Sequence, residues 1–317
     1  MTGGTGFLGS ALVRRLVTSG AQVRVLDNNS RGRAARLADL EGRIEYVEAD
    51  VREPDPVIRA CAGIDVTCHL AYVNGTEHFY TKPDLVLDVA VKGMVNVMDG
   101  CLQHKVPELL VMSSSEVYHQ PPVVPTPESV PMVIPDVLNP RFSYAAGKMI
   151  HEVMAINFAR HFSRVVVVRP HNVYGADQGF EHVIPQFVHR MQKLAAAAPG
   201  TVKFPMQGDG RQTRSFVYID DFTDGVMLVL EKGENRGIYH IGSHEEVTMA
   251  ALAEMVGRYF GRQIEIVAGP PAHGGTNRRC PDITRMQALG YQPRTALRDG
   301  LPIVARWYAQ HTAPAAH

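Results

Sequence analysis

The sequence lacks several features that mark particular classes of protein. Its 317 residues carry no net charge at pH 7, because 32 lysines and arginines balance 32 aspartates and glutamates. This balance gives no reason to expect binding to nucleic acid or to an anionic membrane. No apolar run approaches the length of a membrane span, and residues 1–20 do not resemble a secretory signal. The length suffices for one large or two medium globular domains.

Cysteine is scarce as well. The four cysteines, at positions 61, 68, 101 and 280, show no CxxC spacing, so they predict neither a zinc site nor a disulfide framework. The fourteen histidines show no metal-ligand spacing such as HExxH, and we expect no metal. Unpaired cysteines are typical of a reducing compartment, so the expected location is the cytoplasm.

What the sequence does have is a glycine-spaced loop at its start. Gly3, Gly6 and Gly9 fit the turn that binds the pyrophosphate of a dinucleotide. Such a loop leaves the end of a buried parallel strand of about five residues. Only Met1 and Thr2 precede it in this chain. We therefore expect that the first strand is truncated and that the native chain starts upstream.

An acidic residue follows the loop at the distance that a dinucleotide site requires. The helix-like residues 11–17 lead to a strand at 23–26, which ends at Asp27. A carboxylate at about this separation accepts hydrogen bonds from the adenosine ribose and repels a 2′-phosphate, so it favours NAD. Arg31 and Arg33 follow and could hold that phosphate instead, but we favour a solvated basic loop.

Strand-like and helix-like segments alternate through the first half of the chain. Further strands are predicted at 44–47, 64–71, 109–113 and 165–170, and long helices at 85–102 and 143–160. This alternation predicts an α/β fold with a doubly wound parallel sheet, and a dinucleotide-binding domain over residues 1–170. Beyond Pro170 the pattern is irregular, so residues 171–317 are predicted to form mainly a smaller C-terminal substrate-binding lobe. Residues 237–241 look like a strand of the sheet, so the two parts should interleave.

Three residues form a candidate proton-transfer set. Tyr144 and Lys148 lie four apart at the start of a predicted helix, so their side chains share one face. A nearby ammonium stabilises phenolate, which can take a proton from a substrate hydroxyl. Ser114 follows the predicted strand 109–113 and can hydrogen-bond that hydroxyl and Tyr144.

At this point the chain resembles the extended short-chain dehydrogenases/reductases that act on nucleotide sugars. The resemblance covers nearly the whole chain, because its motifs occur in order. They are the glycine loop, Asp27, Asp50-Val51, His69-Leu70-Ala71, SSSEVY at 113–118, YxxxK at 144–148, RPHNVYG at 169–175, QTRSFVYIDD at 212–221 and RCPDI at 279–283.

The resemblance implies expected roles for individual residues. The catalytic residues are Ser114, Glu116, Tyr144 and Lys148. NAD is expected at Gly3, Gly6, Phe7, Leu8, Gly9, Asp27, Asn28, Asp50, Val51, Leu70, Ala71, Tyr72, Tyr144, Lys148 and Pro170. The nucleotide-diphosphate sugar is expected at Ser114, Asn172, Val183, Arg214 and Arg279. His171 and His182 are further candidates for acids or bases, although a lone histidine is more often a packing residue.

The resemblance does not select one reaction. Members oxidise the sugar, usually at C4, and the 4-keto product then epimerises, loses water or, as a hexuronate, loses carbon dioxide. Glu116 matches a glutamate of 4,6-dehydratases and UDP-glucuronate decarboxylases, which favours elimination over simple epimerisation. Other stretches resemble GDP-mannose 3,5-epimerase, which has a cysteine at this position. Met149 stands where the decarboxylases have an arginine, so no subfamily fits throughout.

Three positions depart from the family pattern. Ala90 stands where an asparagine is usual near the nicotinamide, Tyr72 where a small residue is usual, and His119 where glycine is usual. The sequence thus predicts an NAD-dependent nucleotide-sugar epimerase or dehydratase, with a hexuronate decarboxylase as the alternative. A catalytically silent dinucleotide-binding sensor or scaffold is the alternative of another class. Residues 85–103 and 143–160 resemble helices that pair two protomers, so a homodimer is expected.

Overall fold

The computed structural model describes residues 1–197, 200–270 and 274–311. Its centre is a parallel sheet in the order β2-β1-β3-β4-β5-β10, in which Thr2 lies between β1 and β3 and bridges Leu26 and His69. The strands are β1 (Val23–Asp27), β2 (Ile44–Glu48), β3 (Val66–His69), β4 (Glu108–Met112), β5 (Arg164–Pro170) and β10 (Gly237–Ile241). The expected truncation of a first strand stays a prediction.

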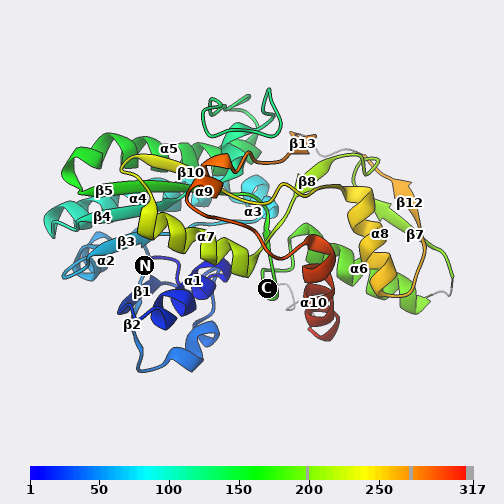
Figure 1. Ribbon diagram of the computed structural model, residues 1–317, viewed down its shortest axis with the longest axis horizontal. Coiled ribbons are helices and arrows are strands. Elements are labelled where there is room, and N and C mark those ends of the chain that lie inside the picture. The colour runs from blue at the N-terminus through cyan, green and yellow to red at the C-terminus, as the bar shows by residue number, and fades with distance from the viewer. Residues whose placement is uncertain (198–199, 271–273, 312–317) are drawn as a thin grey trace.

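Helices cover both faces of this sheet (Figure 1). One face carries α1 (Phe7–Thr18) and α7 (Ile219–Lys232), which pack together. The other carries α2 (Pro54–Ala60), α4 (Pro83–Gln103) and α5 (Ser143–Phe158). Strands with helices on both sides need apolar residues on both sides, and residues 165–168 of β5 are four buried valines. The predicted doubly wound α/β fold is confirmed.

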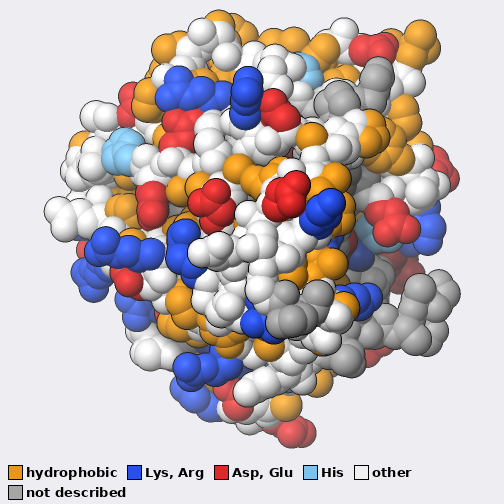
Figure 2. All heavy atoms as spheres, turned by 90° about the vertical axis from the view of Figure 1, so that its right-hand side faces the viewer, with side chains coloured by type: hydrophobic (Ala, Val, Ile, Leu, Met, Phe, Trp, Pro, Cys, Tyr) orange, Lys and Arg blue, Asp and Glu red, His pale blue; other side chains and the backbone are white. Residues whose placement is uncertain are grey.

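The C-terminal lobe has a core of its own. It is built from α6 (Val183–Ala197), α8 (Met249–Tyr259), α10 (Leu297–Gln310) and the parallel pair β7 (Val202–Met206) and β12 (Ile264–Ala268). Phe204 and Tyr308 are among its fully buried side chains. On the face of the molecule in Figure 2, basic and acidic side chains are interspersed.

Short elements join the sheet to this lobe. β8 (Thr213–Ser215) pairs with β11 (Glu246–Thr248) and with β13 (Arg278–Arg279). Further short elements lie elsewhere in the chain: β6 (Val173–Tyr174), β9 (Val217–Tyr218), α3 (Thr76–Thr81), α9 (Thr284–Ala288) and the 3₁₀ helices η1 (Ala34–Leu40), η2 (Ser115–Tyr118), η3 (Pro140–Phe142) and η4 (Ala159–His161).

The sheet draws on both halves of the sequence. β10 comes from the C-terminal half and pairs in parallel with β5, with His240 opposite Arg169. The domain boundary at residue 170 therefore stays a sequence-based prediction, because the chain returns to the sheet after it. Among the described residues, no helix is long and apolar enough to cross a membrane.

Candidate active site

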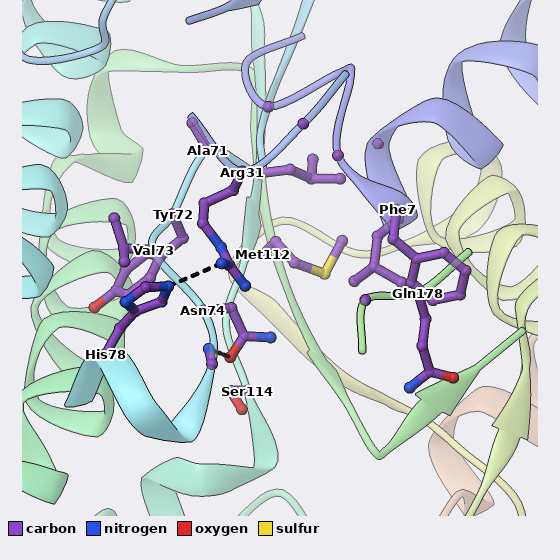
Figure 3. A pocket seen from close by; sticks show the side chains of 18 of the residues that line it. Phe7, Arg31, Ala71, Tyr72, Val73, Asn74, His78, Met112, Ser114 and Gln178 are labelled. Atoms are coloured by element: carbon purple, nitrogen blue, oxygen red, sulfur yellow. Dashed lines mark hydrogen bonds between the residues drawn. The ribbon is translucent and has the colours of Figure 1, made fainter. Parts of the chain in front are cut away.

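A cleft of about 830 Å³ opens at the carboxyl ends of β1, β3, β4 and β5, where open parallel sheets bind ligands. Figure 3 shows side chains from several of these strand ends directed into it. The structure brings together nearly all the predicted site residues in this cleft. The lining includes Gly3, Gly6, Phe7, Leu8, Gly9, Asp27, Asn28, Asp50, Val51, Leu70, Ala71, Tyr72, Ser114, Glu116, Tyr144, Lys148, Pro170, Asn172 and Arg279.

The glycine loop fits a dinucleotide because side chains would block it. A Cβ on Gly3, whose φ is +73°, would lie 2.6 Å from the backbone nitrogen of Ala71. A Cβ on Gly9 would lie 2.0 Å from the carbonyl oxygen of Gly3. Asp27 is buried at the end of β1, and its carboxylate accepts hydrogen bonds from the backbone N–H groups of Thr5 (3.0 Å) and Asn29 (2.9 Å). The cradle therefore suits a pyrophosphate beside a fixed carboxylate.

The basic loop after Asp27 is not simply solvated. Arg31 forms an ion pair with Glu181 and a 2.8 Å hydrogen bond with His78. Arg33 forms an ion pair with Asp177. Both arginines are exposed, as expected for a solvated loop, and their pairing with carboxylates more than a hundred residues along the chain is a contact that the sequence did not predict.

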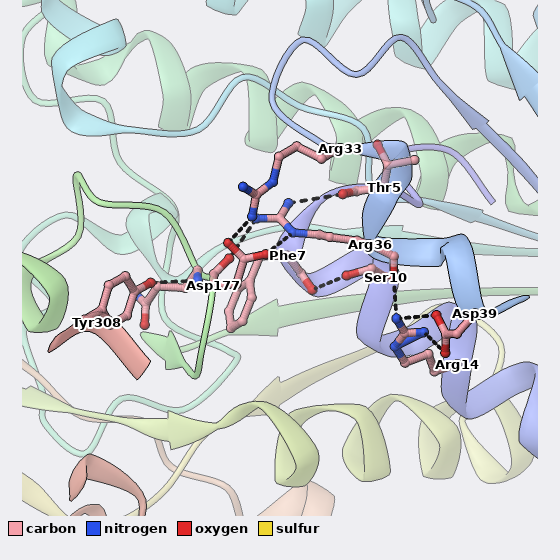
Figure 4. Close-up of polar contacts among 10 residues, drawn as sticks. Thr5, Phe7, Ser10, Arg14, Arg33, Arg36, Asp39, Asp177 and Tyr308 are labelled. Carbon is pink, nitrogen blue, oxygen red and sulfur yellow. Dashed lines mark hydrogen bonds and ion pairs between the residues drawn. The ribbon is translucent and has the colours of Figure 1, made fainter. Parts of the chain in front are cut away.

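A third arginine completes this set, as Figure 4 shows. Arg36 donates to the Asp177 carboxylate at 2.7 Å and to the carbonyl oxygen of Thr5 at 3.1 Å. It thus connects the glycine loop to the segment before α6. The six side chains that span the cleft are called the interlobe clasp below: Arg31, Arg33, Arg36, His78, Asp177 and Glu181.

Ser114, Tyr144 and Lys148 lie together and are at most 8% exposed. Ser114 follows β4, while the other two lie on the first turns of α5. Burial raises the pKa of Tyr144 to about 12, against a hydrogen bond from Ser114. Burial lowers the pKa of Lys148 to about 7, against the pull of Glu152.

The lysine is not directed at the phenol oxygen. Its Nζ donates to the carbonyl oxygen of Met112 at 2.7 Å and lies 5.9 Å from the ring centre of Tyr144. The sequence predicts that the ammonium lowers the pKa of Tyr144, but in the protein burial raises this pKa, and the groups that oppose burial are Ser114 and Arg279. The positive charge of an oxidised nicotinamide would act in the lowering direction.

Glu116 is an ionised carboxylate in this cleft. Burial alone would raise its pKa, but Arg279, Arg141 and Arg214 together hold it at about 2. Arg279 donates to Glu116 at 2.6 Å, and Arg141 lies 3.6 Å away. Three guanidinium groups around one carboxylate leave an excess of positive charge at this end of the cleft.

Two predicted substrate residues do not line the cleft. Arg214, on β8, lies opposite Arg279 on β13, and burial followed by Arg279 lowers its pKa to about 10. Val183 begins α6, directly after His182, which does line the cleft. Their contact with a sugar nucleotide stays a prediction.

The two histidine candidates differ. His182 lines the cleft, whereas His171 is fully buried with its ring centre 4.9 Å from that of His240. Burial lowers the pKa of both His171 and His182. Neither ring nitrogen of His171 has a hydrogen-bond partner within the described residues. His171 is thus placed in the packing behind the cleft.

Several site residues carry no signal in the sequence and were missed. Phe79 stacks on Tyr144 with ring centres 4.7 Å apart, and Gln178 lines the opposite wall. They belong to segments after β3 and before α6, where no periodicity or spacing singles them out. The polar run ahead of α6, which includes Asp177, is the local feature that could have drawn attention to the second segment.

The fold and this cleft define an NAD-dependent enzyme of the short-chain dehydrogenase/reductase type. Residues 1–242 match the NAD dependent epimerase/dehydratase family. The chain belongs to that family, so the predicted family, fold class and cofactor are confirmed.

Curated relatives carry out several reactions. UDP-glucuronic acid decarboxylase 4 of Arabidopsis thaliana is 31% identical, over 98% of this chain and 68% of that protein. A dTDP-4-dehydro-6-deoxy-D-allose reductase of Streptomyces bikiniensis is 30% identical over 98% and 96%. These relatives confirm the predicted class of enzyme, the NAD-dependent nucleotide-sugar epimerases and dehydratases.

Solved structures of nucleotide-sugar enzymes share the fold of this chain. The dTDP-glucose 4,6-dehydratase DesIV of Streptomyces venezuelae, with NAD and TYD bound, has a TM-score of 0.86 and 29% identity, covering 98% of this chain and 96% of that chain. A UDP-glucose 4-epimerase of Thermotoga maritima, with UDP-glucose, also gives 0.86, at 25% identity, covering 98% and 97%.

Proposed function

We propose that the chain converts a nucleotide-diphosphate sugar through a 4-keto intermediate, with Ser114, Tyr144, Lys148 and Glu116 as its catalytic residues. The glycine loop and Asp27 would hold NAD, which would supply reversible hydride transfer with the sugar. Tyr144 takes the proton of the C4 hydroxyl, and Ser114 shares a hydrogen bond with that hydroxyl. Lys148 contributes positive charge near both. The burial and proximity of these groups support the assignment.

For the second step, the state of Glu116 favours decarboxylation of a 4-keto hexuronate. Elimination of a C6 hydroxyl requires an acid at C6 as well as a base at C5. Glu116 has a pKa of about 2, held there against burial by its arginines, so it is ionised at neutral pH and has no proton to donate at C6. A 4-keto hexuronate needs no acid at C6, because the C5–C6 bond breaks with loss of carbon dioxide and its electron pair passes into the C4–C5 enolate. This enolate then takes a proton at C5 from water before hydride returns to C4.

The arginines suit an anionic substrate. Arg279, Arg141 and Arg214 surround Glu116 with more positive charge than it neutralises. A sugar carboxylate or diphosphate oxygen would complete this charge balance. The similarity to UDP-glucuronic acid decarboxylases supports decarboxylation, and the similarity to a 4,6-dehydratase keeps dehydration as the second candidate.

One incubation separates these reactions. The purified enzyme, with NAD, is given UDP-glucuronate, UDP-glucose, dTDP-glucose and GDP-mannose in parallel, and products are weighed by mass spectrometry. We expect loss of carbon dioxide from the hexuronate. Loss of water from a hexose would establish dehydration instead, and an isomer of unchanged mass would establish epimerisation.

The catalytic assignment has its own control. Tyr144→Phe should abolish turnover while the enzyme still binds NAD, whereas Tyr80→Phe, at an exposed position of α3, should retain turnover. Full activity of Tyr144→Phe would refute the proposed base.

We also propose that the enzyme is a homodimer through α4 and α5. Leu87, Val91 and Val95 recur every four residues on α4 and are 36–38% exposed, and Val153 on α5 is 53% exposed. Since α4 and α5 pack together, these side chains form an apolar stripe that a second copy would cover. Light scattering should give a dimer mass, and Val91→Glu should reduce it towards that of a monomer. A wild-type monomer at micromolar concentration would overturn this.

The cytoplasmic location stays a prediction from the cysteines. All four are free thiols and buried, which is compatible with a reducing compartment. Activity in a cell fraction with soluble cytoplasmic markers would test it.

A further inference from the structure

Tyr72 has an unusual contact with the proposed catalytic lysine. The Nζ of Lys148 lies 3.8 Å above the centre of the Tyr72 ring, well within the range of a cation–π interaction. Figure 3 places Tyr72 in the segment of the cleft that follows β3, beside Ala71 and Val73. The family that the sequence resembles usually has a small residue at this position.

The surrounding chain is shaped to hold this ring. The Tyr72 hydroxyl donates to the backbone carbonyl of Tyr144 at 3.0 Å, and the two rings meet edge to face at 5.0 Å. A Cβ on Gly147 would lie 2.0 Å from that hydroxyl and 2.6 Å from the Cβ of Ala90. The tyrosine therefore fits because Gly147 has no side chain and position 90 has a small one.

Lys148 has little else to stabilise its charge. Within the described residues its one hydrogen bond goes to the carbonyl of Met112. Glu152, one turn further along α5, is committed to Arg169, which it pairs with at 2.6 Å, and to Ser113. The lysine is 3% exposed, so water does not replace these partners.

Among the other titratable groups around Lys148, only Glu152 acts as a counter-charge that raises the pKa of the lysine, and its carboxylate is already paired with Arg169. These groups come from α5 and from β3 and the segment that follows it: Tyr144, His151, Glu152, His69 and Tyr72. Burial lowers the pKa of His69 and of His151, and the charge of Lys148 adds to this, so both are neutral at pH 7. Burial raises the pKa of Tyr72 well above its usual value, so its ring is a neutral phenol.

We propose that Tyr72 is a positioning residue for Lys148, whose ammonium the face of the Tyr72 ring keeps charged and in place beside Tyr144. The inference rests on the proposed function, because it assigns a role to a residue that acts through the catalytic lysine. The contact is a feature of this chain, in which Ala90 stands where the family usually has an asparagine. The aromatic face of Tyr72 takes the place of a polar neighbour of the lysine.

The direct test measures the pKa of Lys148 by NMR of lysine carbons in the full chain with NAD added and no sugar. Lys148→Met identifies the resonance. Tyr72→Leu keeps the site apolar but removes the ring, so the pKa of Lys148 should fall by about 1 unit. Tyr72→Phe keeps the ring and should leave it within about 0.3 units, because the hydroxyl is not what contacts the ammonium.

A graded series covers the case in which Tyr72→Leu does not fold. Phenylalanines with one, two and three ring fluorines at position 72 keep the shape and progressively weaken the negative face. The pKa of Lys148 should fall stepwise along the series. An unchanged pKa across it, or an equal fall in Tyr72→Phe and Tyr72→Leu, would overturn the proposal.

Kinetics distinguish this proposal from the proposed function. If both hold, kcat falls along the series and the alkaline limb of its pH profile, where Lys148 loses its proton, moves to lower pH, with KM for the sugar nearly unchanged. If the pKa of Lys148 responds but no nucleotide sugar turns over in the wild type, Tyr72 still positions the lysine and the proposed function fails. If turnover is present but the pKa does not respond, the positioning role alone fails.

Discussion

At the scale of single residues, His119 holds a backbone conformation that suits glycine. Its φ is +52° and its ψ is −102°, a region that residues with a Cβ rarely adopt. The same position is usually glycine in the family that the sequence resembles. Such a conformation costs a residue with a Cβ about 1–3 kcal/mol. Glycine would remove this cost, but the greater freedom of glycine in the unfolded chain would offset about 0.5–1 kcal/mol of the stability gained.

His119→Gly should therefore raise the free energy of unfolding by about 1 kcal/mol, measured by urea denaturation. The matched control is Lys105→Gly, at an exposed position with a φ of +52° where the chain leaves α4. It should change stability less, because a residue just after a helix commonly adopts the left-handed conformation. A loss of stability in His119→Gly would mean that its edge contact with Phe142, at 5.0 Å, outweighs the strain.

The residues that the sequence predicted correctly as neighbours share one property. Tyr144 and Lys148 are four apart on a helix, and Ser114 follows a buried strand, so local periodicity fixes where their side chains point. Tyr72 and Phe79 contact Tyr144 from a segment about seventy residues earlier. Their contacts depend on how the segment after β3 packs against α5, and no local pattern encodes that.

At the scale of elements, the interlobe clasp ties the loop after β1 to the segment before α6. Arg31 and Arg33 lie beside the cleft near Asp27, where free guanidinium groups would attract a 2′-phosphate. Glu181 and Asp177 pair with them instead. The clasp thus supports the preference for NAD that Asp27 establishes.

Neutralising both acids should release these arginines. In Asp177→Asn/Glu181→Gln, affinity for NADP should rise about tenfold, because a charge-assisted contact is worth about 1.5–3 kcal/mol. Cofactor titration followed by fluorescence or calorimetry measures this. Asp39→Asn removes a comparable surface partner, that of Arg14, away from the cleft, and should leave NADP affinity unchanged. An equal rise in this control would point to net charge alone.

The elements themselves were predictable where they are regular. The predicted strand 237–241 coincides with β10, and the predicted helix 143–160 with α5, because apolar periodicity determines both. The predicted strand 64–71 was too long. β3 ends at His69, because Leu70 and Ala71 turn away to line the cleft.

At the scale of the whole molecule, buried neutral histidines make the fold sensitive to acid. Burial lowers the pKa of His69 and of His240 to about 3, and lowers those of His151 and His171 as well. In the unfolded chain such groups titrate near 6.5. As the pH falls from about 6.5 towards 3, the unfolded chain binds protons that the folded chain does not, so stability is lost in that window.

The free energy of unfolding should fall by up to about 1.4 kcal/mol per pH unit for each of these histidines. Urea denaturation at several pH values between about 7.5 and 5.5 measures the slope. His171→Leu removes one titrating group whose ring nitrogens have no partner in the described part of the chain, and should make the slope shallower. His104→Leu, near the surface after α4, should not. Identical slopes in all three proteins would contradict the assignment.

The pairing of β10 with β5 limits how this enzyme can be recombined with its relatives. A chimera joined at residue 170 would exchange the substrate lobe and, with it, an outer strand of the cofactor sheet. The imported strand would have to pair with the valines of β5. It would also have to replace the contact of His240 with Tyr118 at 2.6 Å. We therefore expect loops grafted onto an intact sheet to transfer substrate specificity to this chain with less loss of stability than the exchange of residues 171–317.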